Sequence, residues 1–438
     1  MHPRAFTVVG LVLAALLSMA PAARGQQSTG GELTVTAPSP GKVLTLDEAV
    51  ALAVRQQPTI TSARQSELAA QARVGETRSA YYPRFDWLTS AGRSQTFSQS
   101  LNAPIAGNSI ATAVQGTQIL YDFGKTGSTV DQARAGARAA NAVLVQTRQT
   151  VVQNVKTAYF NLLQAQRLVR VAQDNLSLTE LNLKSAQGFY DVGTKPKSDV
   201  TLAEVQVANA RVALIQARNQ VDLGQTILVN AIGIETTAPL DIEDILTYDP
   251  VSLDLRTLLQ EALTNRPELR QARAQIEAAQ AQLAGAKAGY LPTVTATGLY
   301  GGASGDPALH ETWSITGNLS WNLFQGFLTA SQVRETTALA AAARANYTTQ
   351  ELQVRLDVEQ AYFTVVAASE SVGATDKEVQ SAQENLQLAQ GRYDAGVGTI
   401  LDLTTAQVAL SSAQADQVRA LTTFRVGLAT LDRVLGRP

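Results

Sequence analysis

The chain repeats itself, and the two copies keep a constant spacing along the sequence. The segment SAYYPRF aligns with AGYLPTV at an offset of 209 residues, which pairs Pro83 with Pro292. Further on, AQGFYDVGT aligns with AQGRYDAGV at an offset of 203 residues, which pairs Tyr190 with Tyr393. Because matches at constant offsets indicate an internal duplication, any fold for this chain must be built from two equivalent units.

Both units predict the same order of elements. A helix of roughly 35 residues, kinked at Pro58 or Pro267, precedes two strands, a long helix, a tight turn and a last helix. Repeat 1 covers 45–233, with strands at about 84–98 and 108–122, a long helix over 125–190, a turn over 191–198 and a helix over 199–232. After an inter-repeat linker over 234–254, repeat 2 covers 255–436, with strands at about 293–302 and 312–323, a long helix over 327–393, a turn over 394–401 and a helix over 402–436.

The first 25 residues have the features of a secretion signal. His2 and Arg4 give a basic start, Ala5 to Leu17 form an apolar run, and small residues follow it. This run is shorter than the ~20 residues that a membrane-spanning helix needs. We expect residues 1–25 to be removed, and residues 26–44 to form an N-terminal extension ahead of repeat 1.

The long helices carry an uninterrupted seam. From Val151 to Tyr190, and again from Val354 to Tyr393, steps of four and three residues land on uncharged, mostly apolar or small side chains. A sustained period of 3.5 residues predicts left-handed coiled-coil packing, and a 65-residue helix reaches ~100 Å. On this seam alone, the chain could be an ordinary two-stranded coiled coil of a fibrous or adaptor protein.

The strand segments favour a membrane protein. Between Thr312 and Phe324 apolar and polar residues alternate, which is typical of a strand with one apolar and one polar face. Aromatic residues lie in or beside the strands: Trp87, Trp313, Trp321, Tyr82, Tyr121, Tyr290 and Phe324. Such residues bracket the strands of outer-membrane barrels at the two lipid interfaces, although a small soluble sheet capping a helical bundle also alternates.

Four strands are too few to close a barrel, for which about eight are the minimum. Open strand edges are not viable in lipid, because their backbone groups would lack hydrogen-bond partners. A barrel built from these strands must therefore be shared between copies of the chain. Composition does not determine how many copies contribute.

Composition excludes several other functions. Lys and Arg number 35 against 37 Asp and Glu, and losing Arg4 and Arg24 leaves the mature chain near −4, so nothing suggests nucleic acid. There is no Cys, so we expect neither disulfides nor an N-terminal lipid anchor. His310, expected in a solvated loop, is the only His after the signal, so an enzyme, a cofactor or a metal site is not expected.

The segments FYDVGTKPKSDV and RYDAGVGTILDL, each joining a long helix to a shorter one, resemble the TolC family of outer-membrane efflux proteins over residues 45–436. The resemblance implies a mainly α fold with a membrane β-barrel part. It implies a homotrimer in which four strands per chain form a twelve-stranded barrel, continued by a periplasmic α-helical coiled-coil barrel. It implies a passive outer-membrane exit duct of a tripartite efflux or type I secretion system, with a periplasmic adaptor and an inner-membrane transporter as partners.

The resemblance also implies roles for residues at the closed end. Tyr393 matches the tyrosine that constrains the inner helix pair, and Asp402 matches one acidic ring of the pore constriction. The family's arginine falls on Gly398 and its second acidic ring on Thr405. Two segments match the motif that contacts the adaptor: Val192, Gly193 and Thr194 closely, and Ala395, Gly396 and Val397 loosely.

Asp199 and Asp402 have two compatible interpretations. Each follows a Gly-containing turn at the start of a helix, so each is a candidate N-cap. In a symmetric assembly each would also form a ring of carboxylates that favours cations. The rival function is an extended periplasmic coiled-coil adaptor or scaffold without a pore; a stand-alone porin would not need such long helices. The transported substrate cannot be inferred from the sequence.

Overall fold

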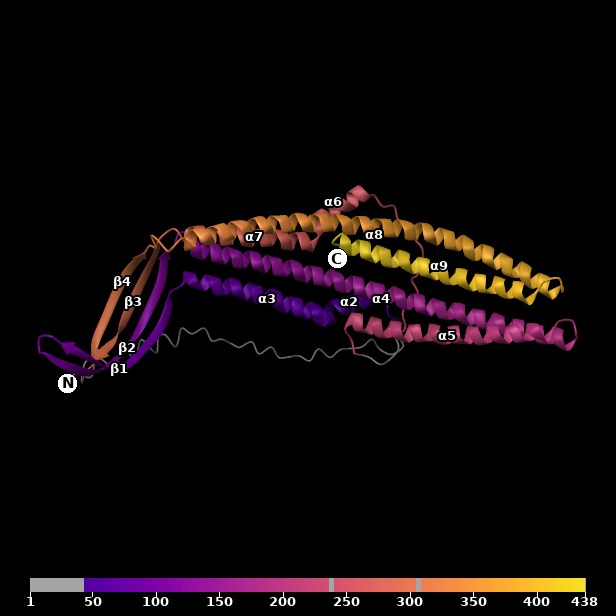
Figure 1. The fold of residues 1–438 in the computed structure, drawn as a ribbon, viewed down its shortest axis with the longest axis horizontal. Coiled ribbons are helices and arrows are strands. Elements are labelled where there is room, and N and C mark those ends of the chain that lie inside the picture. The colour runs from indigo at the N-terminus through magenta and orange to yellow at the C-terminus, as the bar shows by residue number, and fades with distance from the viewer. Residues whose placement is uncertain (1–42, 236–239, 305–308, 438) are drawn as a thin grey trace.

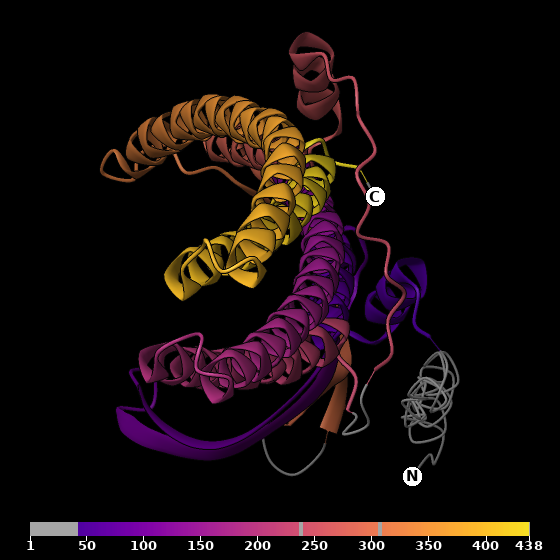
Figure 2. The ribbon, with the colours of Figure 1, turned by 90° about the vertical axis from the view of Figure 1, so that its right-hand side faces the viewer.

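The computed structural model describes residues 43–235, 240–304 and 309–437, which form a long body with strands at one end and helices along the rest (Figure 1). Seen end-on, the helices follow an arc instead of a closed bundle (Figure 2). The predicted signal (1–25) and most of the N-terminal extension (26–44) lie outside the described residues. None of the described helices is both long enough and apolar enough to cross a membrane.

Apart from a 3-10 turn in repeat 1, the two repeats contain the same elements in the same order. Repeat 1 consists of α2 (Leu46–Gln56), α3 (Pro58–Arg78), a 3-10 turn η1 (Ser79–Tyr81), β1 (Arg84–Ser98), β2 (Ala103–Tyr121), α4 (Lys125–Asp191) and α5 (Lys197–Ile232). Repeat 2 consists of α6 (Leu255–Asn265), α7 (Pro267–Ala288), β3 (Thr293–Ser304), β4 (Leu309–Ser320), α8 (Leu328–Asp394) and α9 (Ile400–Val434).

The prediction of one kinked helix at the start of each repeat is wrong, because the chain forms two separate helices there. The break falls at Gln57 and Arg266, each in an extended conformation immediately before a proline. A proline ring clashes with a helical residue in front of it, which forces that residue out of the α region. The prolines therefore start α3 and α7 at a position where a missing N–H costs nothing.

The predicted strands also shift at their ends. β2 begins at Ala103, five residues before the expected start, and extends the first hairpin. β4 runs from Leu309 to Ser320, three residues earlier than expected at both ends, so Trp321 follows the strand. His310 consequently lies in β4, opposite Ala303, and not in a loop.

The long helices pack as coils. α4 packs along α5 and α8 packs along α9, with the seam residues buried or half-buried between them. Val155, Leu162, Val358 and Val365, for example, expose 2% or less of their surface. Tyr190, the last residue of the first seam, differs from this pattern because it is 44% exposed.

The helices are ordered across the arc. α4 packs on α3 and α5 on one side and on α7 and α9 on the other, and α8 packs on the far side of α7 and α9. α7 and α9 of repeat 2 are thus covered on both sides by long helices. α3 and α5, which hold the corresponding places in repeat 1, contact a long helix on one side only.

The linker between the repeats is tied to the middle of α4. Leu44 forms a parallel bridge with Ile242. The buried hydroxyl of Tyr159 lies within hydrogen-bonding distance of the carbonyl oxygens of Leu44 (3.0 Å) and Glu243 (2.9 Å) and can donate to either. Burial raises the pKa of Tyr159 to about 12. The neutral hydroxyl has one proton, so it satisfies one of these two buried backbone carbonyls at a time.

Candidate functional site

The four strands form one antiparallel sheet in the order β1-β2-β3-β4, so the two repeats join at the β2–β3 pair. Directly paired residues of neighbouring strands lie on the same face of a sheet. One row of pairs runs Trp87, Val114, Tyr300, Trp313 across all four strands. These side chains therefore share one face, and Tyr300 lies on it beside the predicted aromatic residues.

The opposite face is polar. A neighbouring row of pairs runs Arg84, Thr117, Thr297, Thr316 across the same strands. An apolar and a polar face on one sheet match a barrel wall that separates lipid from a water-filled interior. The outer edges of β1 and β4 have no strand partner within the described part of the chain.

A β-bulge in β2 changes the face on which its last residue lies. The pairing with β3 shifts between Ile119 and Tyr121, so Tyr121 pairs with Val294. Val294 in turn pairs with Leu319 on the apolar face. Since an extra residue reverses the alternation of side chains, the bulge moves Tyr121 onto the apolar face.

The predicted interface aromatics are all exposed on the single chain. Their exposed fractions lie between 49% and 74% for Trp87, Trp313, Trp321, Tyr82, Tyr121, Tyr290 and Phe324. The indole of Trp321 donates a hydrogen bond to the carbonyl oxygen of Tyr290 at 3.0 Å. This bond fixes one aromatic ring at the junction between the sheet and the helices.

The far end of the helices forms a second candidate region, here called the tip, made of the α4–α5 turn (192–196), the α8–α9 turn (395–399) and the helix ends beside them. Tyr393 is fully buried there, with its ring 5.7 Å from that of Phe189 on α4. It belongs to a small apolar cluster with Ile400 and Leu403. Tyr393 therefore contacts both repeats, and its role in constraining the helices stays a prediction.

The hydroxyl of Tyr393 is buried without a hydrogen-bond partner among the described residues. Burial, together with the nearby negative charges of Asp199 and Asp394, raises its pKa above the ordinary value. An unpaired buried hydroxyl costs free energy. The apolar packing of the Tyr393 ring therefore leaves the one polar atom of the side chain unsatisfied.

The expectation that Asp199 and Asp402 are N-caps is wrong, because both helices begin earlier. Thr399 is the N-cap of α9, and Asp402 is the third helical residue of a reciprocal capping box with it. Hydrogen bonds from the side chain and backbone of Thr399 lower the pKa of Asp402. Asp199 holds the same place in α5, but Pro196 is the cap residue and offers no side-chain hydrogen bond.

The predicted adaptor-contacting residues form the outermost surface of the tip. Gly193 and Gly396 both have a φ of +78°, a conformation that favours glycine. Beside them Val192 is 71% exposed and Val397 is 79% exposed, and Thr194 and Ala395 are exposed as well. Thr405 is exposed on α9, with its hydroxyl donating only to the carbonyl oxygen of Leu401 in its own helix.

Lys195 is a tip residue that sequence reasoning missed. Its ammonium group donates a hydrogen bond to the carbonyl oxygen of Gly398 at 3.1 Å and lies 5.0 Å from the centre of the Tyr393 ring. Nothing in the local sequence signals this contact, because the partners are 203 residues apart in the chain.

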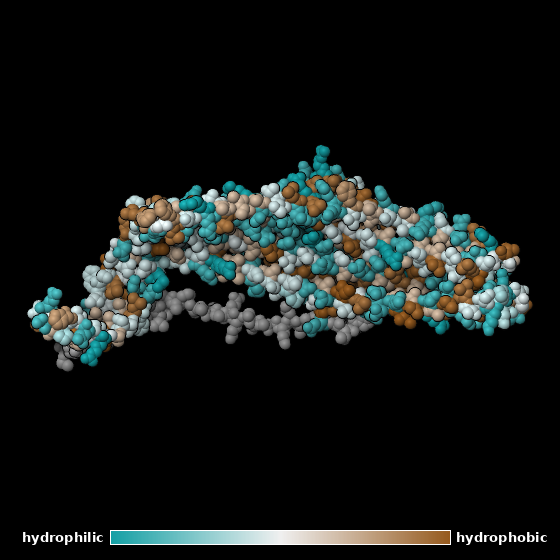
Figure 3. Space-filling view, in the orientation of Figure 1, coloured by the Kyte–Doolittle hydropathy of each residue, from teal (hydrophilic) through white to brown (hydrophobic). Residues whose placement is uncertain are grey.

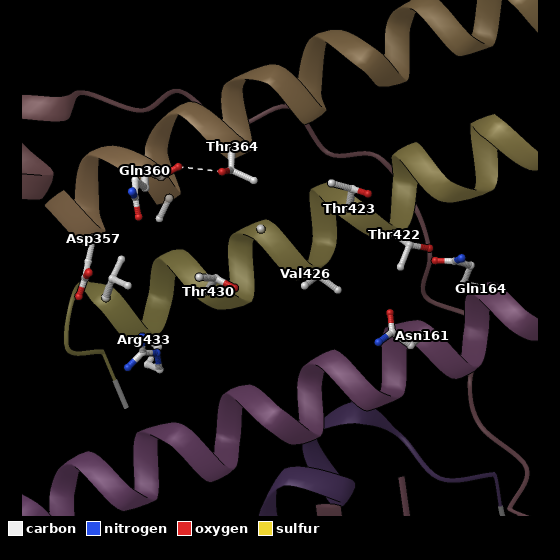
Figure 4. Close-up of a pocket in the computed structure, with 13 residues that line it drawn as sticks. Asn161, Gln164, Asp357, Gln360, Thr364, Thr422, Thr423, Val426, Thr430 and Arg433 are labelled. Carbon is white, nitrogen blue, oxygen red and sulfur yellow. Dashed lines mark hydrogen bonds between the residues drawn. The ribbon is translucent and has the colours of Figure 1, made fainter. Parts of the chain in front are cut away.

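A recess of about 430 Å³ lies between α4, α8 and α9 in the middle of the molecule (Figure 4). Its labelled side chains include threonines and amides from all three helices, such as Asn161, Gln360 and Thr430. Within the described ranges, no three His, Cys, Asp or Glu residues are grouped to hold a metal ion. The recess is lined by apolar and polar side chains, and Asp357 and Arg433 are its charged members.

The chain belongs to the outer membrane efflux protein family. The family model matches residues 49–234 and 258–437, which are the two repeats. The chain is 26% identical to the outer membrane protein TolC of Salmonella enteritidis, over 84% of this chain and 77% of that protein. It is 27% identical to the protein CyaE of Bordetella pertussis, over 83% of this chain and 78% of that protein.

Solved structures share the fold. The outer-membrane channel OprN superposes with a TM-score of 0.82 at 21% identity, covering 90% of both chains. The CmeC outer membrane channel of Campylobacter jejuni superposes with a TM-score of 0.81 at 18% identity, covering 89% of this chain and 85% of that one. With the family match, the protein is an outer-membrane efflux protein with a large helical part in the periplasm.

Proposed function

We propose that identical copies of this chain assemble head to tail into a passive duct that carries substrates from the periplasm through the outer membrane. The observation that carries the proposal is a difference in burial between equivalent residues of the two repeats. Positions that other helices of the chain bury in one repeat are exposed in the other. The exposed positions of each copy therefore need a second copy of the chain to cover them.

The long helices show this difference at two phenylalanines. Phe160 of α4 is 5% exposed and belongs to a core cluster that includes Val418 of α9. Phe363, its equivalent 203 residues later on α8, is 60% exposed. An exposed phenylalanine on a helix face whose counterpart is core indicates a surface that another protein covers.

The shorter helices show the complementary difference. Val418 of α9 is 7% exposed and belongs to the same core cluster as Phe160. Its equivalent in repeat 1, Ile215 of α5, is 66% exposed. Apolar side chains gather over α5 along the lower edge of the helical part in Figure 3. The contact of Phe160 with α9 inside one chain would thus be repeated by Phe363 against Ile215 of the next copy.

A contact between two different surfaces of one chain is heterologous, and such contacts close into rings when the rotation per copy allows it. The curvature of the helical arc supports closure (Figure 2). The same repetition would pair the free edge of β4 with that of β1 in the next copy. Three copies would supply twelve strands, above the minimum of about eight for a barrel.

The helical part suits a partner on the periplasmic side. The chain resembles proteins named for pumps and export, including the solvent efflux pump outer membrane protein SrpC of Pseudomonas putida, to which it is 28% identical over 67% of this chain. The exposed residues Val192 and Val397 at the tip would contact a periplasmic adaptor, which links the duct to an inner-membrane transporter. The duct has no site of its own for consuming energy in this proposal.

The test is to extract the protein from outer membranes in detergent, measure its mass by light scattering, and record conductance in planar lipid bilayers. We expect a homotrimer that forms ion-conducting channels. A monomer in micelles without conductance would overturn the duct. A product that stays soluble without detergent would favour the rival function, a periplasmic adaptor or scaffold.

A further inference from the structure

We propose that Lys195 fastens the tip of repeat 1 to the tip of repeat 2 and so sets how readily the narrow end of the duct opens. This inference rests on the proposed duct. The structure provides a contact across the two helical coils at their free ends, made by a residue whose counterpart in the other repeat has no side chain.

The contact has two parts. The ammonium group of Lys195 donates to the carbonyl oxygen of Gly398 at 3.1 Å, and it lies over the ring of Tyr393 at 5.0 Å from the centroid. A charged donor makes a stronger hydrogen bond than a neutral one, and an aromatic face attracts a cation. Lys195 is half-buried, so both attractions act in a site partly shielded from water.

Position 398 has no room for a side chain, so a glycine fits there. A Cβ at this position would lie 2.9 Å from the backbone nitrogen of Tyr393 and 3.0 Å from atoms of Arg392. The amide of Gly398 also donates to the carbonyl oxygen of Arg392 at 2.8 Å, which fixes the turn. The acceptor for Lys195 is therefore a rigid carbonyl group and not a mobile side chain.

The two partners hold equivalent positions, because Lys195 and Gly398 are separated by the repeat offset of 203 residues. The cation is present in repeat 1 only. It fastens the two coils of one chain, and the corresponding place toward a neighbouring copy has no side chain to form the same link. We therefore infer that the tip is held within each chain by Lys195 and separates more easily between chains.

The link is suited to opening. Among the described ion pairs none involves Lys195, so its charge is balanced by a carbonyl dipole and a ring and not by a carboxylate. Breaking the contact returns one ammonium group and one carbonyl group to water, without stranding a buried charge.

The experiment compares three full-length variants in planar bilayers. Lys195→Met keeps the length and apolar stem of the side chain and removes the charge, and we expect the resting conductance to rise by about twofold or more, since the narrowest part limits ion flow. Lys195→Arg should retain the wild-type conductance. Lys197→Met is the matched control, because Lys197 is an exposed lysine at the start of α5, beside the same turn.

A second measurement does not depend on conductance. Chymotrypsin cleavage after Tyr393, in detergent-solubilised protein, should be faster in Lys195→Met than in the wild type and unchanged in Lys197→Met. Equal conductance and equal cleavage in Lys195→Met and wild type would overturn the role of Lys195. Wild-type protein that never conducts, yet shows the difference in cleavage, would instead overturn the proposed duct and leave the Lys195 contact standing.

Discussion

The side-chain amide of Asn182 on α4 donates a 2.7 Å hydrogen bond to Gln407 on α9, and both residues are buried. The amide of Gln407 in turn donates to the side-chain oxygen of Asn175 at 3.2 Å. This network joins the coil of repeat 1 to the coil of repeat 2 partway between the linker and the tip. A buried polar network between helices fixes their register, because a shifted register leaves its groups unpaired.

Replacing one partner of this network should cost more than replacing both. We expect Gln407→Leu to lower the free energy of unfolding by about 1–3 kcal/mol, since Asn182 is left buried and unpaired. The double variant Asn182→Leu with Gln407→Leu should recover part of that loss. Urea titrations in detergent, followed by circular dichroism, measure both. A double variant as unstable as the sum of the single variants would contradict the coupling.

The exposed phenylalanine on α8 predicts an effect on assembly and not on the fold of one chain. Phe363→Glu places a charge in the proposed interface, and we expect it to weaken each contact by about 2–5 kcal/mol and to shift the protein toward monomers. Val397→Glu is the matched control, because Val397 is more exposed and lies at the tip. Light scattering gives the mass, and an unchanged oligomer in Phe363→Glu would argue against this interface.

The sheet contains a glycine at a position with no room for a side chain. A Cβ at Gly301 would lie 2.1 Å from the carbonyl oxygen of Thr112 and 2.6 Å from Cα of Ala113. Gly301→Ala must therefore disturb the β2–β3 pairing that joins the repeats, at a cost of about 1–3 kcal/mol or more. Gly317→Ala, in β4, meets nothing within 4 Å and serves as the control. Loss of the proposed oligomer in light scattering, in the first variant alone, is the expected result.

The carboxylates at the tip predict a response to cations. If Asp199 and Asp402 form rings in the assembled duct, the double variant Asp199→Asn with Asp402→Asn should weaken block by multivalent cations by about tenfold or more. Single-channel recordings with added trivalent cations measure the block. Asp131→Asn, far from the tip on α4, removes one charge without touching the rings. Unchanged block in the double variant would remove the acidic-ring role.

The capping box predicts how this block depends on pH. Hydrogen bonds from Thr399 lower the pKa of Asp402 below its ordinary value of 3.8. A lowered folded pKa stabilises the fold above about pH 4, and that contribution is lost as the pH falls through the folded pKa. Without the Thr399 hydroxyl, Asp402 should take up a proton and lose its charge at a higher pH. Cation block in Thr399→Val should therefore disappear at a higher pH than in the wild type. Thr405→Val, which removes a hydroxyl bonded only within α9, should leave the pH dependence unchanged.

Much of the fold can be predicted from the sequence, because its strongest signals are periodic. α4 and α8 end within one residue of their predicted limits, since a seam without charges ends where glycine-containing turns begin. The cleanest alternating strand, β4, has the predicted apolar face. The start of β2 differs from the prediction, because the five added residues, APIAG, are mostly small, include a proline and show no alternation of apolar and polar side chains.

The candidate site was harder to predict, because its contacts join distant parts of the chain. The partners Phe189 and Tyr393 lie on different repeats, and no local pattern indicates that their rings meet. Lys195 looks like an ordinary solvated lysine in a turn until the second repeat is placed beside it. Tyr190 holds the place equivalent to Tyr393 but is 44% exposed, and the matching local sequences give no sign of this difference.

The two strand hairpins have unequal lengths, with 15 and 19 residues in β1 and β2 against 12 in each of β3 and β4. In the proposed ring the hairpins alternate, so the rim at the cell surface would form a crown of tall and short points. In that arrangement the taller β1–β2 points, near Leu101 and Asn102, would be the part of the protein that a large molecule arriving from outside meets first.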